Sequence, residues 1–324
     1  MAEKNPQKQP LVSIIIPTYN RPEYLNLALA SAVQQTYQNI EIIVSDNCSP
    51  ENPELIVKSF GDSRIRFFRN ESNLGMFANT MNAFKKARGK YVASLLDDDL
   101  WEKDFLAKLV PALEDNSNLA LAFCDHYIID GKGTIDPAAT EKCSRFYKRK
   151  NLSEGTYQPF YKLSLIDRAV STATAAVIRR EIIDWDSIPS EVGGSWDIYL
   201  NYLCCRSGLG AYYCPAKLTR YREHENTDTM QSGRRNFQAK VRKAKSDLFC
   251  YEQFMKDEQL AELYPYFEKK WGHICTSLGI GLMRGENLQE ARTRFWDSLK
   301  RHFSLRTIAA LIVSFVPPRI AAKF

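Results

Sequence analysis

The sequence predicts an α/β protein with a mostly parallel sheet, helices on both faces of that sheet, and a C-terminal helical region. Short apolar runs alternate with helical patterns through the first 125 residues, as in sheets whose parallel strands are joined by crossover helices. Polar residues directly follow three of the predicted strands, at the edge where such sheets bind ligands. Beyond residue 234 the pattern is helical nearly to the end.

The predicted strands are continuous apolar runs, which is typical of strands buried on both faces. They cover residues 11–16, 40–44, 65–68, 91–96 and 119–123. Helical patterns separate them, at residues 22–33, 54–60, 74–87 and 102–114. Residues 131–153 are polar and predict a mobile loop, after which strands recur near residues 174–178 and 211–214.

The composition is that of an ordinary soluble globular protein, with 44% hydrophobic and 25% charged residues. No apolar run is long enough to span a bilayer as a helix, and the polar first ten residues lack the apolar core of a signal peptide. We therefore expect a cytoplasmic protein. The eight cysteines show no paired spacing, which favours buried free thiols over disulfides or a zinc site.

Positive charge is concentrated in the last third of the chain. Residues 234–324 contain 17 Lys and Arg against 9 Asp and Glu, whereas the whole chain has a net charge of +6. Such a segment suits anionic lipid, phosphate-rich substrates or nucleic acid, or is simply a solvated helical surface. Nucleic acid is the least favoured partner, because residues 234–245 lack the interleaved aromatic residues of a stacking platform.

Three adjacent aspartates, Asp97, Asp98 and Asp99, end the fourth predicted strand. Neighbouring carboxylates repel one another, so a cation at this turn would stabilise their charged forms. Mg²⁺ and Mn²⁺ bind through carboxylates together with phosphate oxygens of a substrate. The position at the ligand edge of the sheet favours a metal site over a solvated turn whose last aspartate caps the next helix.

Three further residues are candidates for chemistry. Asp46 closes the second predicted strand, where it could accept hydrogen bonds from a ribose or base, or form an Asx turn. Asp197 stands just inside a predicted helix and fits either a general base or a favourable charge at a helix N-terminus. His224 alternates with Arg220 and Arg222 on a predicted strand face, which suits a diphosphate or a metal. The other histidines lack such context and are interpreted as structural, namely His126, His273 and His302.

Five motifs, in this order, resemble those of family 2 glycosyltransferases of the GT-A fold. They are VSIIIPTYNR at 12–21, IIVSDN at 42–47, DDDLW at 97–101, WD at 196–197 and YREHENT at 221–227. Each motif alone is weak, but their order over residues 11–227 is specific. The resemblance implies a GT-A, Rossmann-like sheet and an enzyme that transfers a sugar from a nucleotide diphosphate donor.

The resemblance also implies roles for the matching residues. The donor pocket would be formed by Pro17, Tyr19, Arg21, Asp46, Arg69, Asn73, Asp97 and Asp98. The metal would be held by Asp97, Asp99 and His224. Tyr19 would stack on the base, and Asp197 would be the catalytic base. Leu96 stands where the family often has a first aspartate, so the sequence leaves open which of the three aspartates contacts the metal.

The implied reaction is a direct, inverting displacement. Asp197 would take the proton of an acceptor hydroxyl as its oxygen attacks the anomeric carbon from the face opposite the nucleotide. Mn²⁺ or Mg²⁺ would offset the charge that grows on the departing diphosphate. A UDP-sugar is the expected donor, and a saccharide or lipid-linked molecule the expected acceptor, in bacterial surface polysaccharide or glycolipid assembly.

We expect three parts in the chain: a polar leader at 1–10, a catalytic domain at 11–230 and a basic helical region at 231–324. Within the catalytic domain, residues 11–125 would bind the nucleotide-sugar and residues 126–230 the acceptor. One stripe of the last predicted helix is apolar and is flanked by basic residues; it consists of Leu305, Ile308, Ile312 and Phe315, with Arg306, Arg319 and Lys323 beside it. This helix fits either a peripheral contact with the inner face of the membrane or packing on the domain or on another subunit of an oligomer.

Two other functions are weighed against transfer. A sugar-phosphate nucleotidyltransferase would carry a glycine-rich loop after the first strand, whereas residues 17–24 read PTYNRPEY, without glycine. A non-catalytic nucleotide- or sugar-binding protein of the same fold would not need Asp197 beside the aspartate cluster. The sequence therefore favours the transferase.

Overall fold

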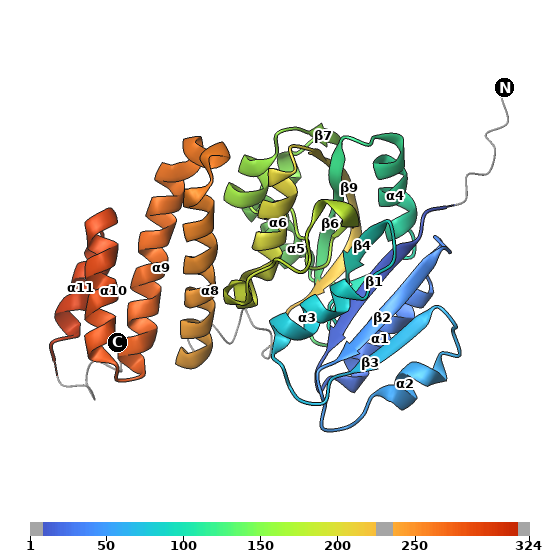
Figure 1. The fold of residues 1–324 in the computed structure, drawn as a ribbon, viewed down its shortest axis with the longest axis horizontal. Helices are drawn as coiled ribbons and strands as arrows, with labels where there is room; N and C mark the ends of the chain where they lie inside the picture. Colours follow the sequence, from blue (N-terminus) through green and yellow to red (C-terminus); the bar gives the residue numbers. More distant parts are fainter. Residues whose placement is uncertain (1–8, 225–235, 317–324) are drawn as a thin grey trace. The chain divides into compact units, whose positions relative to one another are not determined.

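The computed structural model describes residues 9–224 and 236–316 of the chain, which divide into two units (Figure 1). The sheet unit comprises Met1–Ile188 and Leu200–Glu223, and the helical unit comprises Pro189–Tyr199 and His224–Phe324. The expected boundary at residue 230 lies outside the described residues. The structure differs from the expected division in one respect, because Pro189–Tyr199 groups with the C-terminal helices.

A nine-stranded sheet forms the sheet unit, in the order β3-β2-β1-β4-β8-β6-β9-β5, with β7 paired to β9. The pairs β3–β2, β2–β1 and β1–β4 are parallel, and β6 and β9 form a long parallel pair. The antiparallel pairs are short. The strands are β1 (Val12–Thr18), β2 (Ile40–Asp46), β3 (Ile65–Arg69), β4 (Tyr91–Ser94), β5 (Leu100–Trp101), β6 (Leu119–Ile129), β7 (Gly155–Tyr157), β8 (Ala176–Arg179) and β9 (Gly210–Arg222).

Helices cover the sheet because its central strands are apolar on both faces. Alternate residues of β1, namely Val12, Ile14 and Ile16, share one buried cluster with apolar residues of α1 and α4. Helix α3 contacts β1 and β2, and its buried residues lie outside that cluster, so it covers the other face. The helices of this unit are α1 (Pro22–Val33), α2 (Glu54–Ser59), α3 (Met76–Lys85), α4 (Phe105–Asp115), α5 (Pro137–Phe146), η1 (Arg149–Asn151), η2 (Lys162–Ile166), η3 (Arg180–Ile182) and, from Leu200 onward, α6 (Trp196–Arg206). The predicted α/β fold is confirmed.

The prediction of a mobile loop at residues 131–153 is wrong. This stretch contains α5, whose N-cap Asp136 accepts a hydrogen bond from the backbone N–H of Ala139, with Pro137 in the first turn. It ends at η1, where the buried guanidinium of Arg149 donates to Asp125 of β6 at 2.6 Å. The polar residues of this stretch therefore cap and anchor a helix.

The helical unit consists of helices that pack mainly on α9, which contacts both α8 and α10. Gly281 of α9 and Gly285, which caps its C-terminal end, allow α8 to approach closely, because a methyl group on them would meet Val241 Cγ2 at 2.9 Å and Phe237 Cε2 at 2.8 Å. Among the helices that the structure describes, none is long and apolar enough to cross a bilayer. The elements are η4 (Ser190–Ser195), the first turn of α6, α8 (Phe237–Lys256), η6 (Glu258–Leu263), α9 (Tyr264–Arg284), α10 (Leu288–Arg301) and α11 (Leu305–Val313).

Candidate donor and catalytic site

The carboxyl ends of β1, β2 and β4 meet at one edge of the sheet. Thr18 and Asp46, the last residues of β1 and β2, are register partners. The hydroxyl of Thr18 donates to Asp97 Oδ2 at 2.8 Å, although Asp97 follows β4 and is 79 residues away in the sequence. The three polar strand ends that the sequence predicted to converge therefore contact one another.

Arg21 bridges two of the three aspartates. Its Nη1 donates to Asp97 Oδ1 at 3.1 Å and to Asp98 Oδ2 at 2.7 Å. Arg21 directly precedes α1, so the first helix of the chain carries the guanidinium to the turn after β4. This side chain supplies one positive charge where three carboxylates are buried.

Asp99 has a different environment from its two neighbours. Its Oδ2 accepts a hydrogen bond from the Thr174 hydroxyl at 2.5 Å, and its Oδ1 accepts one from the backbone N–H of Arg222 at 2.9 Å. The Arg222 side chain donates from Nε to the Asp98 carbonyl at 2.7 Å. Asp99 thus braces the turn against β9 and the segment before β8.

The charge of the aspartate turn is incompletely balanced by its protein partners. Burial and the neighbouring Asp98 raise the pKa of Asp97 to about 6, despite the opposing effect of Arg21. Burial and Asp98 also raise the pKa of Asp99 well above its usual value. Both shifts mean that the turn carries more negative charge than Arg21, Arg222 and the hydrogen bonds to the carboxylates stabilise. A bound cation would relieve this, so hard oxygen ligands with excess negative charge fit Mg²⁺ or Mn²⁺.

The expected metal ligands Asp97, Asp99 and His224 come from two distant parts of the sequence. Among residues 9–224 and 236–316, no three His, Cys, Asp or Glu side chains are grouped so that they could hold a metal ion. The aspartates belong to the sheet unit and His224 to the helical unit. A metal at this turn would take few protein ligands and fill its coordination with phosphate oxygens and water, as Mg²⁺ usually does.

Asp46 is fully buried and held by an arginine and a serine. Arg69 of β3 donates to Asp46 Oδ2 at 2.8 Å and to the Ser49 carbonyl at 2.7 Å. Both the backbone N–H and the hydroxyl of Ser49 donate to the Asp46 carboxylate, and the same hydroxyl accepts from the backbone N–H of Asn20 at 2.8 Å. Asp46 therefore holds the turn at residues 46–49 through Ser49 and also joins the loops after β1 and β2.

An amide network fixes the loop that contains Asn73. The Asn47 side chain donates to Asn73 Oδ1 at 2.9 Å and accepts from the backbone N–H of Leu74 at 2.9 Å. Beside this loop, Pro17 lies within β1 opposite Ser45 of β2. Tyr19 follows β1 and is 42% exposed. Its ring therefore presents a surface at the same edge as Asp46.

Asp197 lies in the first turn of α6, in the part of that helix that belongs to the helical unit. The residue before α6 is Ser195 in η4, whose hydroxyl donates to Asp247 Oδ1 of α8 at 2.5 Å. Gly193 has φ of +47°, and a methyl group there would overlap the Ser246 hydroxyl. Contacts with α8 therefore fix the backbone directly before Asp197.

Several of these contacts are not readable from the sequence. Thr174, Ser49 and Asp247 have ordinary local contexts, and their partners lie 75, 3 and 52 residues away. Only Ser49 carried a signal, since an aspartate three residues before it suggested the Asx turn. Arg222 was noted for its alternation with His224, but its side chain contacts the Asp98 backbone.

The sequence profile of Glycosyl transferase family 2 matches residues 13–184, which include every donor-side residue described above. The chain belongs to this family. A relative named UDP-Glc:alpha-D-GlcNAc-diphosphoundecaprenol beta-1,3-glucosyltransferase, from Escherichia coli, is 33% identical over 125 residues, covering 39% of this chain and 49% of the relative. A putative teichuronic acid biosynthesis glycosyltransferase of Bacillus subtilis is 33% identical over 128 residues, covering 39% of this chain and 50% of the relative. The match thus spans about half the length of these curated relatives.

Solved structures show the same GT-A fold at low sequence identity. S. aureus TarS 1–349 in complex with UDP-GlcNAc has a TM-score of 0.65 and 15% identity, with 96% of this chain and 88% of TarS covered. The mannosyltransferase PcManGT from Pyrobaculum calidifontis, in complex with GDP-Man and Mn²⁺, has a TM-score of 0.58 and 18% identity, with 98% and 85% covered. These matches extend through the helical unit, which the family profile does not reach.

Proposed function

We propose that the chain is a metal-dependent, inverting glycosyltransferase that transfers a sugar from a nucleotide diphosphate donor to an acceptor hydroxyl. The observation that carries the proposal is the aspartate turn, where three carboxylates are buried at the ligand edge of a parallel sheet and the Arg21 guanidinium contacts two of them. Mn²⁺ or Mg²⁺ at this turn would supply charge stabilisation for the departing nucleotide diphosphate.

In this proposal the three aspartates have different roles. Asp97 and Asp98, whose oxygens now contact Arg21, face the cation and the donor. Asp99 would hold the turn in place, because its oxygens accept hydrogen bonds from Thr174 before β8 and from the backbone of Arg222 in β9. The remaining donor pocket is assigned to side chains from the loops after β1, β2 and β3: Pro17, Tyr19, Arg21, Asp46, Arg69 and Asn73.

Asp197 is proposed as the general base. The proton of the acceptor hydroxyl moves to its carboxylate while the acceptor oxygen forms a bond to the anomeric carbon and the bond to the diphosphate breaks. One base and one leaving group suffice for inversion, since no carboxylate nucleophile is required. Asp197 stands in the first turn of α6, where an acidic side chain is favourably placed at the N-terminal end of a helix. His224 is assigned near the diphosphate.

The substrate class follows from the relatives. We propose a UDP-sugar donor and a saccharide or lipid-linked acceptor in cell-surface polysaccharide assembly, on the cytoplasmic side of the membrane. Relatives are named for colanic acid and teichuronic acid biosynthesis, and one is named for a diphosphoundecaprenol acceptor. The glycine-free loop after β1 gives no support to the alternative of a nucleotidyltransferase.

The donor site is tested by thermal unfolding with a panel of nucleotide diphosphates, with and without Mn²⁺, for the wild type and for Asp98→Asn. A ligand at about a hundredfold its Kd adds about 2.7 kcal/mol to the stability of the folded state. We expect one nucleotide to raise Tm only with Mn²⁺, and Asp98→Asn to lose that shift. Asp115→Asn, an exposed change at the end of α4, is the matched control and should keep it.

The base is tested separately by nucleotide release. Asp197→Asn should keep the donor-induced rise in Tm and lose turnover by about 10²- to 10⁴-fold, the usual contribution of a general base. An unchanged turnover would remove Asp197 from the reaction. The absence of any nucleotide shift in the wild type would favour a non-catalytic protein of the same fold.

A further inference from the structure

The last described helix, α11, packs one side on α9 and α10 and exposes apolar side chains on the other. Its buried residues are Thr307, Ala310 and Leu311, and the Thr307 hydroxyl lies 2.7 Å from that of Thr276 on α9. Its exposed residues include Leu305 and Ile312, which are 75% and 64% exposed. A helix on a water-soluble surface normally presents polar side chains to solvent. The outer side of α11 therefore needs a partner that covers apolar side chains.

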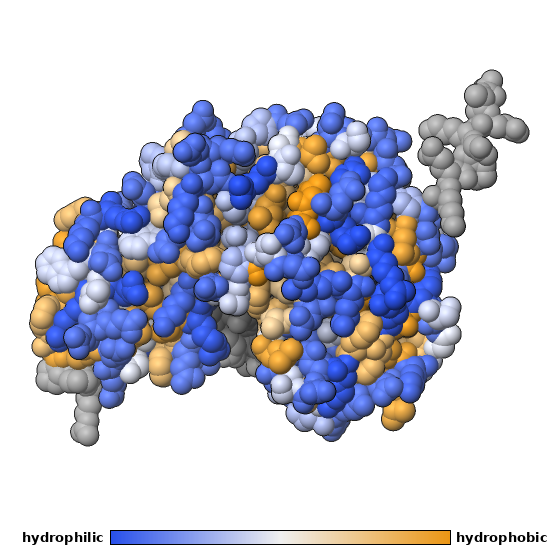
Figure 2. Space-filling view, viewed as in Figure 1, coloured by the Kyte–Doolittle hydropathy of each residue, from blue (hydrophilic) through white to orange (hydrophobic). Residues whose placement is uncertain are grey.

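Apolar residues on either side of α11 extend this exposed surface. Phe303 precedes the helix and is 70% exposed, and Phe315 follows it and is 64% exposed. We call Phe303, Leu305, Ile312 and Phe315 the α11 face. Figure 2 shows apolar residues among hydrophilic ones over the helical unit. Exposed apolar groups gathered in this way mark an interaction site more often than a chance surface.

Cations gather beside the α11 face. Burial lowers the pKa of Lys240 on α8, and the nearby charges of Arg284 and Arg306 lower it further. Burial also lowers the pKa of His273 on α9, and Arg306 is again among the positive groups that act on it. Arg306 directly follows Leu305 on α11. Arg292 of α10 also lies beside the α11 face, because its guanidinium carbon is 4.4 Å from the Phe315 ring centroid.

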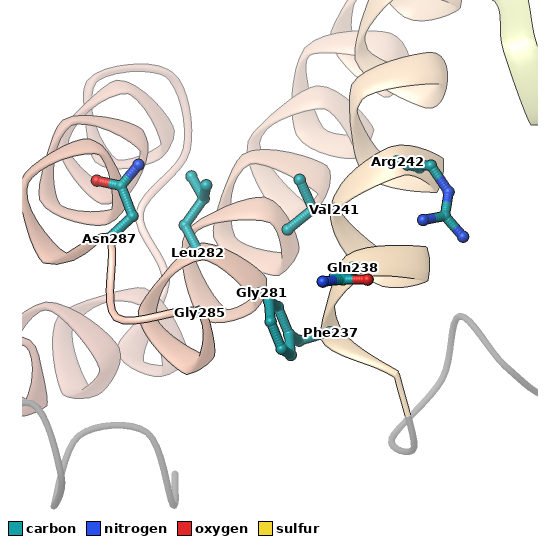
Figure 3. Close-up of a pocket in the computed structure, with 8 residues that line it drawn as sticks. All are labelled: Phe237, Gln238, Val241, Arg242, Gly281, Leu282, Gly285 and Asn287. Carbon is teal, nitrogen blue, oxygen red and sulfur yellow. The ribbon is translucent and has the colours of Figure 1, made fainter.

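A shallow apolar hollow adjoins these cations. It has a volume of about 350 Å³ and is lined by Phe237, Gln238, Val241, Arg242, Gly281, Leu282, Gly285 and Asn287 (Figure 3). Lys240 and Arg284 belong to the same helical turns as these residues. An acyl chain or an apolar side chain could occupy the hollow while an anionic group meets the neighbouring cations.

We propose that the helical unit docks on an anionic lipid bilayer through the α11 face. A surface that combines exposed apolar residues with a rim of Lys and Arg is the pattern of a protein that lies in a membrane interface. The charge of the segment agrees, since residues 234–324 hold 17 basic against 9 acidic residues. A second copy of the chain is a poor occupant, because a two-fold contact through this face would bring Arg306 and its neighbours against the same cations.

The proposal is tested by flotation of the full chain with vesicles of phosphatidylcholine containing or lacking phosphatidylglycerol. We expect binding only to the anionic vesicles, weakening as NaCl rises. Arg306→Glu should weaken partition by about 25-fold, because it removes one cation and adds one anion, and each charge near an anionic surface contributes about fivefold. Leu305→Ser with Ile312→Ser should weaken it by about tenfold or more.

Matched changes in the sheet unit serve as controls. Leu55→Ser removes an apolar side chain that is 80% exposed on α2, and Lys58→Glu reverses an exposed charge on the same helix. Both should bind vesicles as the wild type does, and all variants should keep the wild-type circular dichroism.

Equal binding to both vesicle types, or none, would overturn the proposal. A dimer in light scattering that the α11 variants abolish, without vesicle binding, would assign the face to a second copy. None of these readouts depends on transferase activity, so a failure here leaves the proposed function untouched.

Discussion

Arg222 is the residue that connects most of the aspartate turn to the rest of the sheet unit. Its backbone N–H donates to Asp99 and its Nε donates to the Asp98 carbonyl, at 2.9 and 2.7 Å. The guanidinium also donates to the carbonyls of residues 130 and 131 and lies 4.7 Å from the Tyr24 ring centroid. The planar guanidinium makes these hydrogen bonds in several directions at once, and the compact ammonium group of a lysine cannot replace it.

Arg222→Lys should therefore weaken donor binding and lower stability. Loss of a hydrogen bond from a buried charged group costs about 1.5–3 kcal/mol, so the donor Kd should rise and Tm should fall. Isothermal titration with the nucleotide diphosphate and Mn²⁺ measures the first effect, and calorimetry measures the second. Arg220→Lys is the matched control, because the partly exposed Arg220 pairs with Glu102 and such pairs contribute little. Equal effects of the two substitutions would contradict the special role of Arg222.

At the residue scale, the sequence predicts polar strand ends but not their remote partners. Asp46 and Asp97 follow apolar runs, so their convergence at one edge could be predicted from the alternation of strands and helices. The contact of Thr174 with Asp99 could not, since the pairing of β8 with β4 and β6 decides it and nothing in the local pattern encodes it.

Helix α6, which carries Asp197 in its first turn, directly follows η4, and α8 holds η4 in place. The carboxylate of Asp247 accepts the Ser195 hydroxyl at 2.5 Å, and the backbone at Gly193 fits against Ser246 only because it has no side chain. Asp247 contacts Ser195, and Asp197 follows Ser195 by two residues, so Asp247 acts on Asp197 only through the backbone. We therefore assign it as a positioning residue.

Asp247→Asn should lower kcat by about tenfold with little change in the KM for the donor, because a misplaced base affects the chemical step. Steady-state kinetics with the donor varied separates the two constants. The pH dependence of kcat should shift, which a loss of stability alone would not cause. Lys243→Gln removes the other partner of Asp247 and should leave kcat unchanged. A fall in kcat for both variants would point to general loosening of α8.

At the scale of elements, the sequence predicts the long buried strands but not the elements that depend on pairing with remote residues. Strands buried on both faces, such as β1 and β2, were predicted to within one or two residues because their apolar runs are continuous. The two-residue β5 and three-residue β7 were not predicted, because pairing with β9 defines them. Helix α5 was missed because its polar residues bond to β6, as Ser144 does to Asp125 at 2.6 Å.

At the scale of the whole molecule, the two units differ in charge and in chemistry. The sheet unit contains the residues that match the family profile and the aspartate turn. The helical unit contains residues 234–324, which hold 17 basic against 9 acidic residues, and also Asp197 and the α11 face. Arg319 and Lys323, which the sequence grouped with that face, lie outside the described residues. This division predicts that charge changes in the helical unit alter membrane binding, whereas those at the aspartate turn alter donor binding.

Acid should destabilise the sheet unit through a buried histidine. His126 lies 3.2 Å from Arg149 Nη2 and 3.3 Å from Cys143 Sγ, with Asp125 and Lys217 also acting on its charge. Burial and Arg149 lower the pKa of His126 to about 3, whereas an unfolded histidine has a pKa of about 6.5. The unfolded state therefore binds more protons between these values. The stability that neutral His126 provides is complete above about pH 6.5 and is lost as pH falls toward 3.

We expect the unfolding free energy to fall by about 2 kcal/mol between pH 6.5 and 4.5, measured by urea denaturation at each pH. Arg149 lowers the pKa of Asp125 against the opposing effect of burial. Asp125 therefore adds to the loss of unfolding free energy only at lower pH, because the pKa of an unfolded aspartate is about 3.9. His126→Gln keeps an acceptor for Arg149 but cannot titrate, so its stability should decline less steeply below pH 6.5. Above pH 7 the two profiles should run parallel, which is an internal control for the cost of the substitution itself. Parallel profiles down to pH 4.5 would show that His126 is not the group through which acid acts.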